Sequence, residues 1–203
     1  MTRMATVRLA LWGLVAVAIV GAASLAAWRS WGPEVTTAVE GEALVGGPFE
    51  LVNGTGETVT HTDLEGRPFV IFFGFTHCPD VCPTSLFEMA GWIEELGPAA
   101  ERLRFAFVTV DPERDTPEVM RRYVGAFSER IQPLTGTPAQ VDRVLDAYRV
   151  YARKVPLEDG GYTMDHSAFV YLMDARGRYA AHIAYGEAEE RALAKLRALA
   201  DAG

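Results

Sequence analysis

The 203-residue sequence contains only two cysteines and four histidines. The two cysteines, Cys78 and Cys82, lie four positions apart, so any thiol chemistry is confined to one short segment. Basic residues are also few, because 19 Lys and Arg stand against 27 Asp and Glu, for a formal net charge of -8. This acidic balance argues against nucleic acid or an anionic membrane surface as a partner. No internal repeat or low-complexity tract is evident.

Charge is missing altogether from the apolar run of residues 9–28. About twenty apolar residues suffice to cross the hydrocarbon core of a bilayer. Because Arg3 and Arg8 precede the run, the positive-inside bias favours a cytoplasmic N-terminus. We therefore expect residues 1–30 to be an N-terminal membrane anchor, with the rest of the chain exported. A cleavable signal peptide is the alternative, since residues 22–26 offer small side chains to a peptidase. No cysteine directly follows the run, so we expect no bacterial lipoprotein anchor.

The remaining sequence predicts a linker and one domain. Glycine and proline are frequent in residues 31–46, which indicates a linker. Residues 47–203 are enough for a compact domain with its own core. At its start, residues 49–52 and 58–60 are strand-like and flank a glycine-rich turn, which predicts a small hairpin containing His61 near its end.

Strand and helix patterns alternate along this domain. Continuous apolar runs at 69–73 and 104–110 predict strands buried on both faces. The further expected elements are a helix from about residue 83, a helix after a capping-box pattern at 115–118, a short strand at 131–134, a helix striped by 141–148, an antiparallel hairpin of 167–173 and 179–183, and a final helix at 187–200. This order predicts an α/β, thioredoxin-like fold with an added N-terminal hairpin, preceded by a single transmembrane helix.

Both cysteines fall in the turn between the first buried strand and the helix that follows it. Open α/β sheets bind their ligands at such carboxyl ends of strands. A helix that begins near Pro83 would point free backbone N–H groups at Cys82 or Cys78 and lower the pKa of that thiol. In a helical turn, a spacing of four puts the two Cβ atoms about 5–6 Å apart. That distance suits one bridging metal ion and, with some adjustment, a disulfide.

A distant histidine, His166, would complete a soft metal site if the chain folded back onto the sulfurs. Thiolates select Cu(I) and zinc, and two thiolates with an imidazole also resemble the ligands of Cu(II) sites. Three protein ligands would leave a fourth position open, as a transfer or redox site requires. Exported cysteines would drift to the disulfide unless a metal or a reductant protected them. Cys78, Cys82 and His166 are therefore the candidate metal ligands.

Other interpretations remain open at this point. Cys78 and Cys82 could be the redox pair of a thiol–disulfide reductase, although the usual spacing has two intervening residues rather than three. They could also form a plain disulfide, but a short loop gains little stability from one. A peroxidase of the peroxiredoxin type would need a threonine and an arginine around its cysteine, and neither can be identified.

Several further side chains near the candidate site invite a functional interpretation. We expect His77 to make structural hydrogen bonds, because it is adjacent to Cys78 in sequence. Met164 is expected to serve in packing, and His182 is expected to be an ordinary residue of a strand. Asp111 and Asp115 are expected to be turn and helix-cap residues, with contact to a partner as a secondary hypothesis.

Four motifs occur in order along the chain and carry a resemblance to a known family: Gly74–Pro83, Val110–Pro117, Tyr148–Tyr151 and Asp165–Ser167. From about residue 47 to 186 the sequence resembles the Sco/SenC family. Its members are membrane-anchored, thioredoxin-fold copper proteins of bacterial and mitochondrial inner membranes. The resemblance implies that Cys78, Cys82 and His166 are copper ligands. It also implies delivery of copper to the binuclear copper A site of cytochrome c oxidase, or reduction of the cysteines of that site.

From the residues and the resemblance together we expect a membrane-tethered copper metallochaperone that carries Cu(I), Cu(II) or both. The alternative is a thiol–disulfide reductase that keeps the copper-site cysteines of the oxidase reduced. The expected partners are the copper-accepting subunit of cytochrome c oxidase, a thiol reductant or another copper chaperone, and the membrane through the N-terminal helix. The expected location is the bacterial inner membrane, single-pass, with the C-terminal domain in the periplasm.

Overall fold

The computed structural model describes residues 12, 45–158 and 160–203. The predicted anchor, apart from Trp12, and the predicted linker up to residue 44 lie outside the described residues. Among the described residues, no helix has both the length and the apolar character needed to cross a membrane. The last residues of the predicted linker are attached to the domain, because Gly46 donates its N–H to the Ala147 carbonyl at 2.9 Å.

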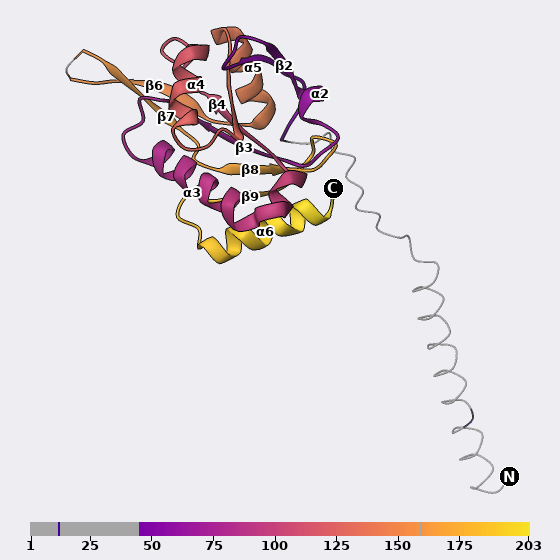
Figure 1. Cartoon of the computed structure of the whole chain (residues 1–203). Coiled ribbons are helices and arrows are strands. Elements are labelled where there is room, and N and C mark those ends of the chain that lie inside the picture. Colours follow the sequence, from indigo (N-terminus) through magenta and orange to yellow (C-terminus); the bar gives the residue numbers. More distant parts are fainter. Residues whose placement is uncertain (1–11, 13–44, 159) are drawn as a thin grey trace, which may run out of the picture. The chain divides into compact units, whose positions relative to one another are not determined.

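A seven-stranded mixed sheet runs through the centre of the domain (Figure 1). Its strand order is β2-β1-β5-β4-β3-β8-β9. The strands are β1 (Glu50–Asn53), β2 (Thr58–Thr60), β3 (Phe69–Gly74), β4 (Arg104–Thr109), β5 (Ile131–Thr135), β8 (Val170–Met173) and β9 (Tyr179–Ile183). The three strands β3, β4 and β5 are parallel to one another, whereas β8 is antiparallel to β3, and β9 is antiparallel to β8 at the edge of the sheet.

Helices cover both faces of this sheet. Figure 1 shows α3 (Val81–Leu96) and α6 (Glu189–Asp201) on one face, with α4 (Pro117–Gly125) and α5 (Pro138–Tyr148) on the other. Two short elements complete the domain: α2 (His61–Leu64) lies between β2 and β3, and the 3₁₀ helix η1 (Gly97–Arg102) lies between α3 and β4. The order β3-α3-β4, a helix on the opposite face, the β8–β9 hairpin and α6 confirms the predicted α/β, thioredoxin-like arrangement.

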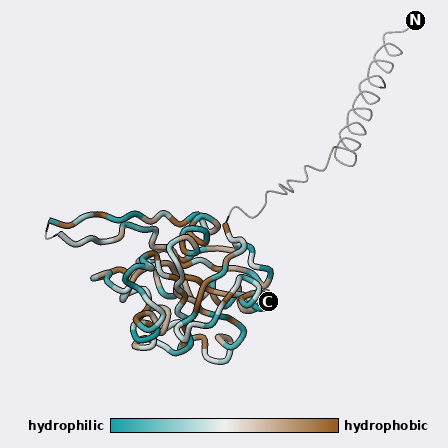
Figure 2. The backbone as a smooth tube through the Cα atoms, turned by 90° about the horizontal axis from the view of Figure 1, so that it is seen from above, coloured by the Kyte–Doolittle hydropathy of each residue, from teal (hydrophilic) through white to brown (hydrophobic). Residues whose placement is uncertain are grey.

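The core lies on the two faces of the central strands. Every residue of β3 is buried, and β4 is buried from its second residue onward. A strand with helices on both of its faces must be apolar along its whole length, which explains its continuous hydrophobic sequence. Figure 2 shows these hydrophobic strands gathered in the interior of the domain.

A second, two-stranded sheet stands apart from the main one and was not predicted. Its strands are β6 (Ala152–Pro156) and β7 (Tyr162–His166), paired antiparallel. Figures 1 and 2 both show this hairpin projecting from the body of the domain. His166 is therefore the last residue of β7, whereas the sequence pattern had indicated the start of the strand that became β8.

Two smaller sequence predictions were wrong for local reasons. Asp115 does not cap α4, because the N-cap is Thr116, whose hydroxyl accepts the Val119 N–H and is followed by Pro117 at the first helical position. Asp115 is instead fully buried. His61 lies in α2 rather than in the hairpin, whose two strands β1 and β2 are otherwise confirmed.

Candidate metal centre

The two cysteines lie in the segment of residues 76–84, here called the cysteine turn, between the end of β3 and the first turn of α3. Both are free thiols. Cys78 is half-buried in the loop, and Cys82 is buried in the first helical turn. The helix begins at Val81, slightly earlier than predicted, so Pro83 lies inside its first turn, where a missing N–H leaves no hydrogen bond unmade.

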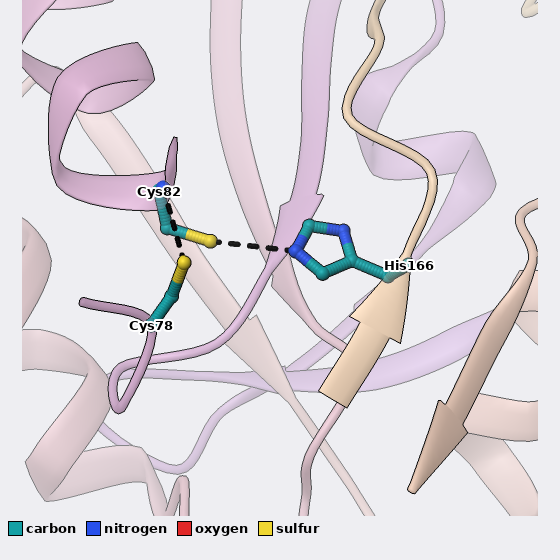
Figure 3. A group of neighbouring side chains, drawn as sticks. All are labelled: Cys78, Cys82 and His166. Carbon is teal, nitrogen blue, oxygen red and sulfur yellow. Dashed lines mark hydrogen bonds between the residues drawn. The ribbon is translucent and has the colours of Figure 1, made fainter. Parts of the chain in front are cut away.

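The start of α3 is capped by sulfur. Asp80, at the N-cap position, makes no side-chain capping hydrogen bond. The Cys82 N–H instead donates to the Cys78 sulfur at 3.4 Å (Figure 3). The first N–H groups of a helix have no partner within it and carry partial positive charge, so they favour a negatively charged acceptor. The predicted aim of the helix at a cysteine is thus borne out, and its target is Cys78.

The two sulfurs share one proton unequally. The pKa of Cys78 is lowered to about 3, mainly because it accepts a hydrogen bond from the Cys82 thiol, with a hydrogen bond from the Cys82 backbone N–H acting in the same direction. The pKa of Cys82 is raised, because its proton is held by Cys78 and because burial penalises its thiolate. The half-exposed sulfur is therefore a thiolate, and the buried sulfur keeps its proton.

A glycine makes room for the buried sulfur. A Cβ added at Gly74, the last residue of β3, would lie 2.7 Å from the Cys82 sulfur and 2.8 Å from the ring of Phe107. Only a residue without a side chain allows the sulfur to pack against the strand end. Gly74 begins the first of the four sequence motifs, and its place between a buried strand and a cysteine was the signal for this role in the sequence.

The imidazole of His166 points its Nε2 atom at the Cys82 sulfur, 3.5 Å away (Figure 3). Its other nitrogen, Nδ1, lies 2.9 Å from the carbonyl oxygen of Ser167. A carbonyl oxygen can only accept, so Nδ1 carries the proton and, in the neutral ring, Nε2 presents a lone pair. The ring is thus oriented by the main-chain oxygen of Ser167. Phe75 supports the ring edge-on at 5.7 Å between centroids.

One donor atom from each of Cys78, Cys82 and His166 lies within 4.8 Å of the others. A tetrahedral ion with bonds of about 2.3 Å to sulfur and about 2.0 Å to nitrogen separates those two donors by about 3.5 Å. The distance from Cys82 Sγ to His166 Nε2 is 3.5 Å. The three side chains that the sequence singled out are thus brought together as a group that could hold a metal ion.

Asp115 holds the cysteine turn in place through hydrogen bonds. Its buried carboxylate accepts hydrogen bonds from the Thr76 N–H at 3.1 Å and the Thr76 hydroxyl at 2.6 Å, two residues before Cys78. The Thr109 hydroxyl also donates to it at 2.6 Å. Burial raises the pKa of Asp115, and these hydrogen bonds oppose that shift. Sequence reasoning missed this role because an acidic residue before Thr-Pro is typical of a helix cap.

The other candidate side chains lie outside the metal group. His77 is about half exposed and contacts Thr76 and, at 3.9 Å, Asp115. Met164 packs against the core, and His182 contacts Phe169 and Tyr179 on β9. These positions agree with the structural roles that we expected for them.

Both the sequence and the fold are similar to those of known proteins. The family model described as SCO1/SenC matches residues 37–201. The chain is 41% identical over 145 residues to the SCO2-like protein RP587 of Rickettsia prowazekii, covering 70% of this chain and 71% of the relative. It is similar in structure to Bradyrhizobium japonicum ScoI with copper bound, at 47% identity and a TM-score of 0.71, covering 76% of this chain and 99% of ScoI.

A third comparison concerns the fold alone. BsSco, described as a member of the Sco family of cytochrome c oxidase assembly proteins, is 21% identical with a TM-score of 0.62. The aligned region covers 80% of this chain and 98% of BsSco. Because the family model covers most of the sequence and the fold matches throughout the domain, the chain belongs to the SCO1/SenC family.

Proposed function

We propose that the protein is a copper metallochaperone and that Cys78, Cys82 and His166 bind the cargo. The observation that carries the proposal is the Nε2 lone pair of His166 facing the Cys82 sulfur across 3.5 Å. An imidazole with its Nδ1 proton held by a carbonyl oxygen is already in the tautomer that binds a metal. Two sulfurs and one imidazole nitrogen form a donor set that copper prefers to harder cations.

Loading and release would begin at the exposed side of the site. Cys78 is the half-exposed thiolate, so it is the first ligand that incoming copper meets. Coordination by the second sulfur requires that Cys82 release its proton to solvent, as metal binding to a thiol generally does. With three protein ligands the fourth position stays open, and an acceptor thiolate or imidazole can enter there as the protein ligands leave.

Membership of the family supports a proposal for the acceptor of the copper and for the location of the protein. BsSco is described as a member of a family of cytochrome c oxidase assembly proteins, and ScoI has been solved with copper bound. We infer that this chain delivers copper to the copper A site on the copper-accepting subunit of cytochrome c oxidase. A thiol reductant or another copper chaperone would supply the reduced or loaded form. The uncharged run of residues 9–28 supports tethering to a bacterial inner membrane with the domain in the periplasm.

A second candidate function is thiol–disulfide reduction, and the low pKa of Cys78 favours it. The Cys78 thiolate would attack a target disulfide, forming a mixed disulfide and releasing one target thiolate. Cys82 would then lose its proton and attack the Cys78 sulfur, which releases the second target thiolate and leaves the pair oxidised. The two electrons come from the cysteine pair, so each further cycle needs an external dithiol reductant. His166 has no required part in this reaction.

The substitution His166→Ala separates the two functions. Copper affinity of the reduced full chain should fall by more than about 100-fold, beyond the range that loss of an outer partner of a ligand costs. The reduction potential of the Cys78–Cys82 pair should stay close to that of the unaltered protein. Competition with a chromophoric Cu(I) chelator measures the affinity, and the sulfur-to-Cu(II) charge-transfer band reports the ligand set.

A matched control is His182→Ala, which removes the histidine on β9 that contacts Phe169 and Tyr179. It should leave copper affinity unchanged. If His166→Ala also left copper affinity unchanged, His166 would not be a ligand and the chaperone site as proposed would be wrong. Retained reduction of target disulfides by that variant would then favour the reductase.

A further inference from the structure

The histidine that completes the metal group stands at the end of a weakly supported hairpin. Strands β6 and β7, residues 152–166 and here called the histidine hairpin, pair only with each other and lie outside the main sheet. Most of their side chains are exposed or half-buried. A two-stranded hairpin is marginal in water without further packing. Something outside the hairpin must therefore hold His166 at a distance from Cys82 that suits a metal.

Arg114 makes several contacts that connect the hairpin to the body of the domain. Its guanidinium lies over the ring of Tyr162, the first residue of β7, at 3.8 Å from the ring centroid. One nitrogen, Nη1, donates to the Tyr162 carbonyl oxygen at 2.9 Å. The Nε atom donates to the carboxylate of Asp111, which is fully buried. The Tyr162 hydroxyl donates to the other oxygen of the same carboxylate at 2.8 Å.

These contacts form a closed ring of three side chains, Asp111, Arg114 and Tyr162, here called the clamp. Asp111 is tied to the sheet, because its N–H donates to the Thr109 hydroxyl at 2.8 Å. Asp111 and Arg114 both belong to the loop between β4 and α4, and Tyr162 belongs to the hairpin. The clamp therefore ties the start of β7 to the rigid end of a buried strand.

Arg114 is also connected to His166 through the side chain of Phe75. The guanidinium lies 5.8 Å from the centroid of the Phe75 ring, which is buried. The same ring meets the imidazole of His166 edge-on at 5.7 Å. Arg114 thus packs on the residue that supports the imidazole and also holds the strand that carries it.

We propose that Arg114, held by Asp111 and Tyr162, is a positioning residue that keeps His166 in reach of the Cys78–Cys82 pair for copper binding. This inference rests on the proposed function, because it concerns the same metal group. Lysine cannot replace arginine in this role, since its ammonium has no flat face to stack on Tyr162 and no fork to reach Asp111 and the Tyr162 carbonyl together. Asp111, predicted from the sequence to be a turn residue, thus helps Arg114 to set the geometry of a ligand four residues along β7.

The test uses the reduced full chain and Cu(I) alone as the probe. Arg114→Lys and Tyr162→Phe should each weaken copper affinity by about ten-fold, the range typical of lost outer partners of a ligand. The control is Arg122→Lys on α4. Arg122 forms an ion pair with Glu118 in which both side chains are exposed, so this substitution should leave copper affinity unchanged. Tyr162→Phe removes one hydroxyl and keeps the stacked ring, so it serves if Arg114→Lys does not fold.

A double substitution decides whether Arg114 acts through His166. In a His166→Ala background, Arg114→Lys should cause no further loss of copper affinity, because the ligand that it positions is gone. Equal losses in both backgrounds would overturn the proposal, and so would unchanged affinity in Arg114→Lys alone. If His166→Ala by itself had no effect, the proposed ligand set would fail, and the positioning role would fall with it. If His166→Ala weakens binding while Arg114→Lys does not, only the positioning role fails.

Hydrogen exchange measured without copper tests whether the clamp holds β7 in place. Amide hydrogen exchange of β7 should quicken in Arg114→Lys and Tyr162→Phe, while exchange in β3 and in the cysteine turn stays as it is in the unaltered protein. The reduction potential of the cysteine pair should also be unchanged, which a general loss of folding would not permit. Uniformly faster exchange across the domain would mean that Arg114 is a stability residue, and the proposal would be overturned.

Discussion

The cysteine turn and the histidine hairpin deliver ligands to one site from very different surroundings. The cysteine turn follows a strand whose six residues are all buried and runs into a sixteen-residue helix. The histidine hairpin consists of five-residue strands that pair only with each other and are mostly exposed or half-buried. Local opening costs little free energy where few apolar contacts are buried, so the hairpin is the part of the site that opens more easily.

This difference would suit the proposed metallochaperone, whose site must hold copper and also give it up. Sulfurs on a rigid turn keep their mutual distance when the cargo is absent, so the site does not have to reassemble each time. An imidazole on a less stable hairpin can move away and open a ligand position for an acceptor. The loop of residues 111–115 joins the two regions, because Asp115 holds Thr76 of the turn while Arg114 holds Tyr162 of the hairpin.

The largest expected effect concerns the reactivity of the two cysteines in the reduced, copper-free full chain. Because the Cys78 pKa is lowered to about 3, its thiolate predominates above that pH and is lost only as the pH falls through it. Iodoacetamide should modify Cys78 more than about 100-fold faster than buried Cys82, at a rate nearly constant from about pH 5 to 8. Mass spectrometry of the alkylated peptides measures both rates.

The same measurement on His166→Ala sharpens the comparison between the two regions. The main cause of the lowered Cys78 pKa is the Cys82 thiol, which lies within the cysteine turn. The selectivity should therefore survive the substitution. A Cys78 rate that rises steeply near the ordinary thiol pKa in this variant would show that the turn is not organised by itself.

A smaller effect is expected from filling the space beside the buried sulfur. Gly74→Ala puts a methyl group 2.7 Å from the Cys82 sulfur and 2.8 Å from the Phe107 ring. Overpacking of this kind should lower the free energy of unfolding by about 1–3 kcal/mol and displace Cys82, with a loss of copper affinity. Denaturant unfolding and Cu(I) competition measure the two consequences.

Gly91→Ala on α3 is the matched control, because an added Cβ meets nothing within 4 Å there. It should raise the free energy of unfolding by about 0.5–1 kcal/mol, since glycine disfavours a helix interior. If Gly74→Ala unfolded at the same denaturant concentration as the unaltered protein, the turn would be less tightly packed than its geometry indicates.

The smallest effect is expected at the outer face of the hairpin. Lys154 contacts Glu113 at 2.6 Å, but both side chains are about half exposed, and its ammonium also lies 4.7 Å from the Tyr162 ring centroid. Lys154→Ala should lower the free energy of unfolding by no more than about 1 kcal/mol, and less in high salt. A loss above about 2 kcal/mol in denaturant unfolding would show that exposed charges, rather than the clamp, anchor the hairpin.

Much of the fold was predictable because its elements have strong local signals. Strand β3 is apolar throughout, and α3 has buried residues at helical spacing, so both were expected near their observed positions. Strands β6 and β7 gave no such signal. With Arg153 and Lys154 exposed on β6 and Asp165 exposed on β7, they lack the apolar alternation of a strand that lies on a core.

The supporting residues of the site were predictable only in part. Asp115 and Arg114 lie in a segment that resembles a turn and a helix start, and local patterns of this kind do not reveal burial. Their roles depend on residues far away in the sequence, because Thr76 is 39 positions from Asp115 and Tyr162 is 48 positions from Arg114. Such contacts arise from packing between elements, which no short window of sequence contains.

The sequence by itself determined the chemistry, since the only two thiols of the chain are four residues apart at the start of a helix. That spacing keeps both thiols within one short turn of the chain, where the local backbone can bring them together. Only the tertiary structure decided which sulfur is the thiolate and that a histidine 84 positions from Cys82 meets it. Both outcomes depend on burial and on long-range packing, and these exist only once the sheet, the helix and the hairpin have come together.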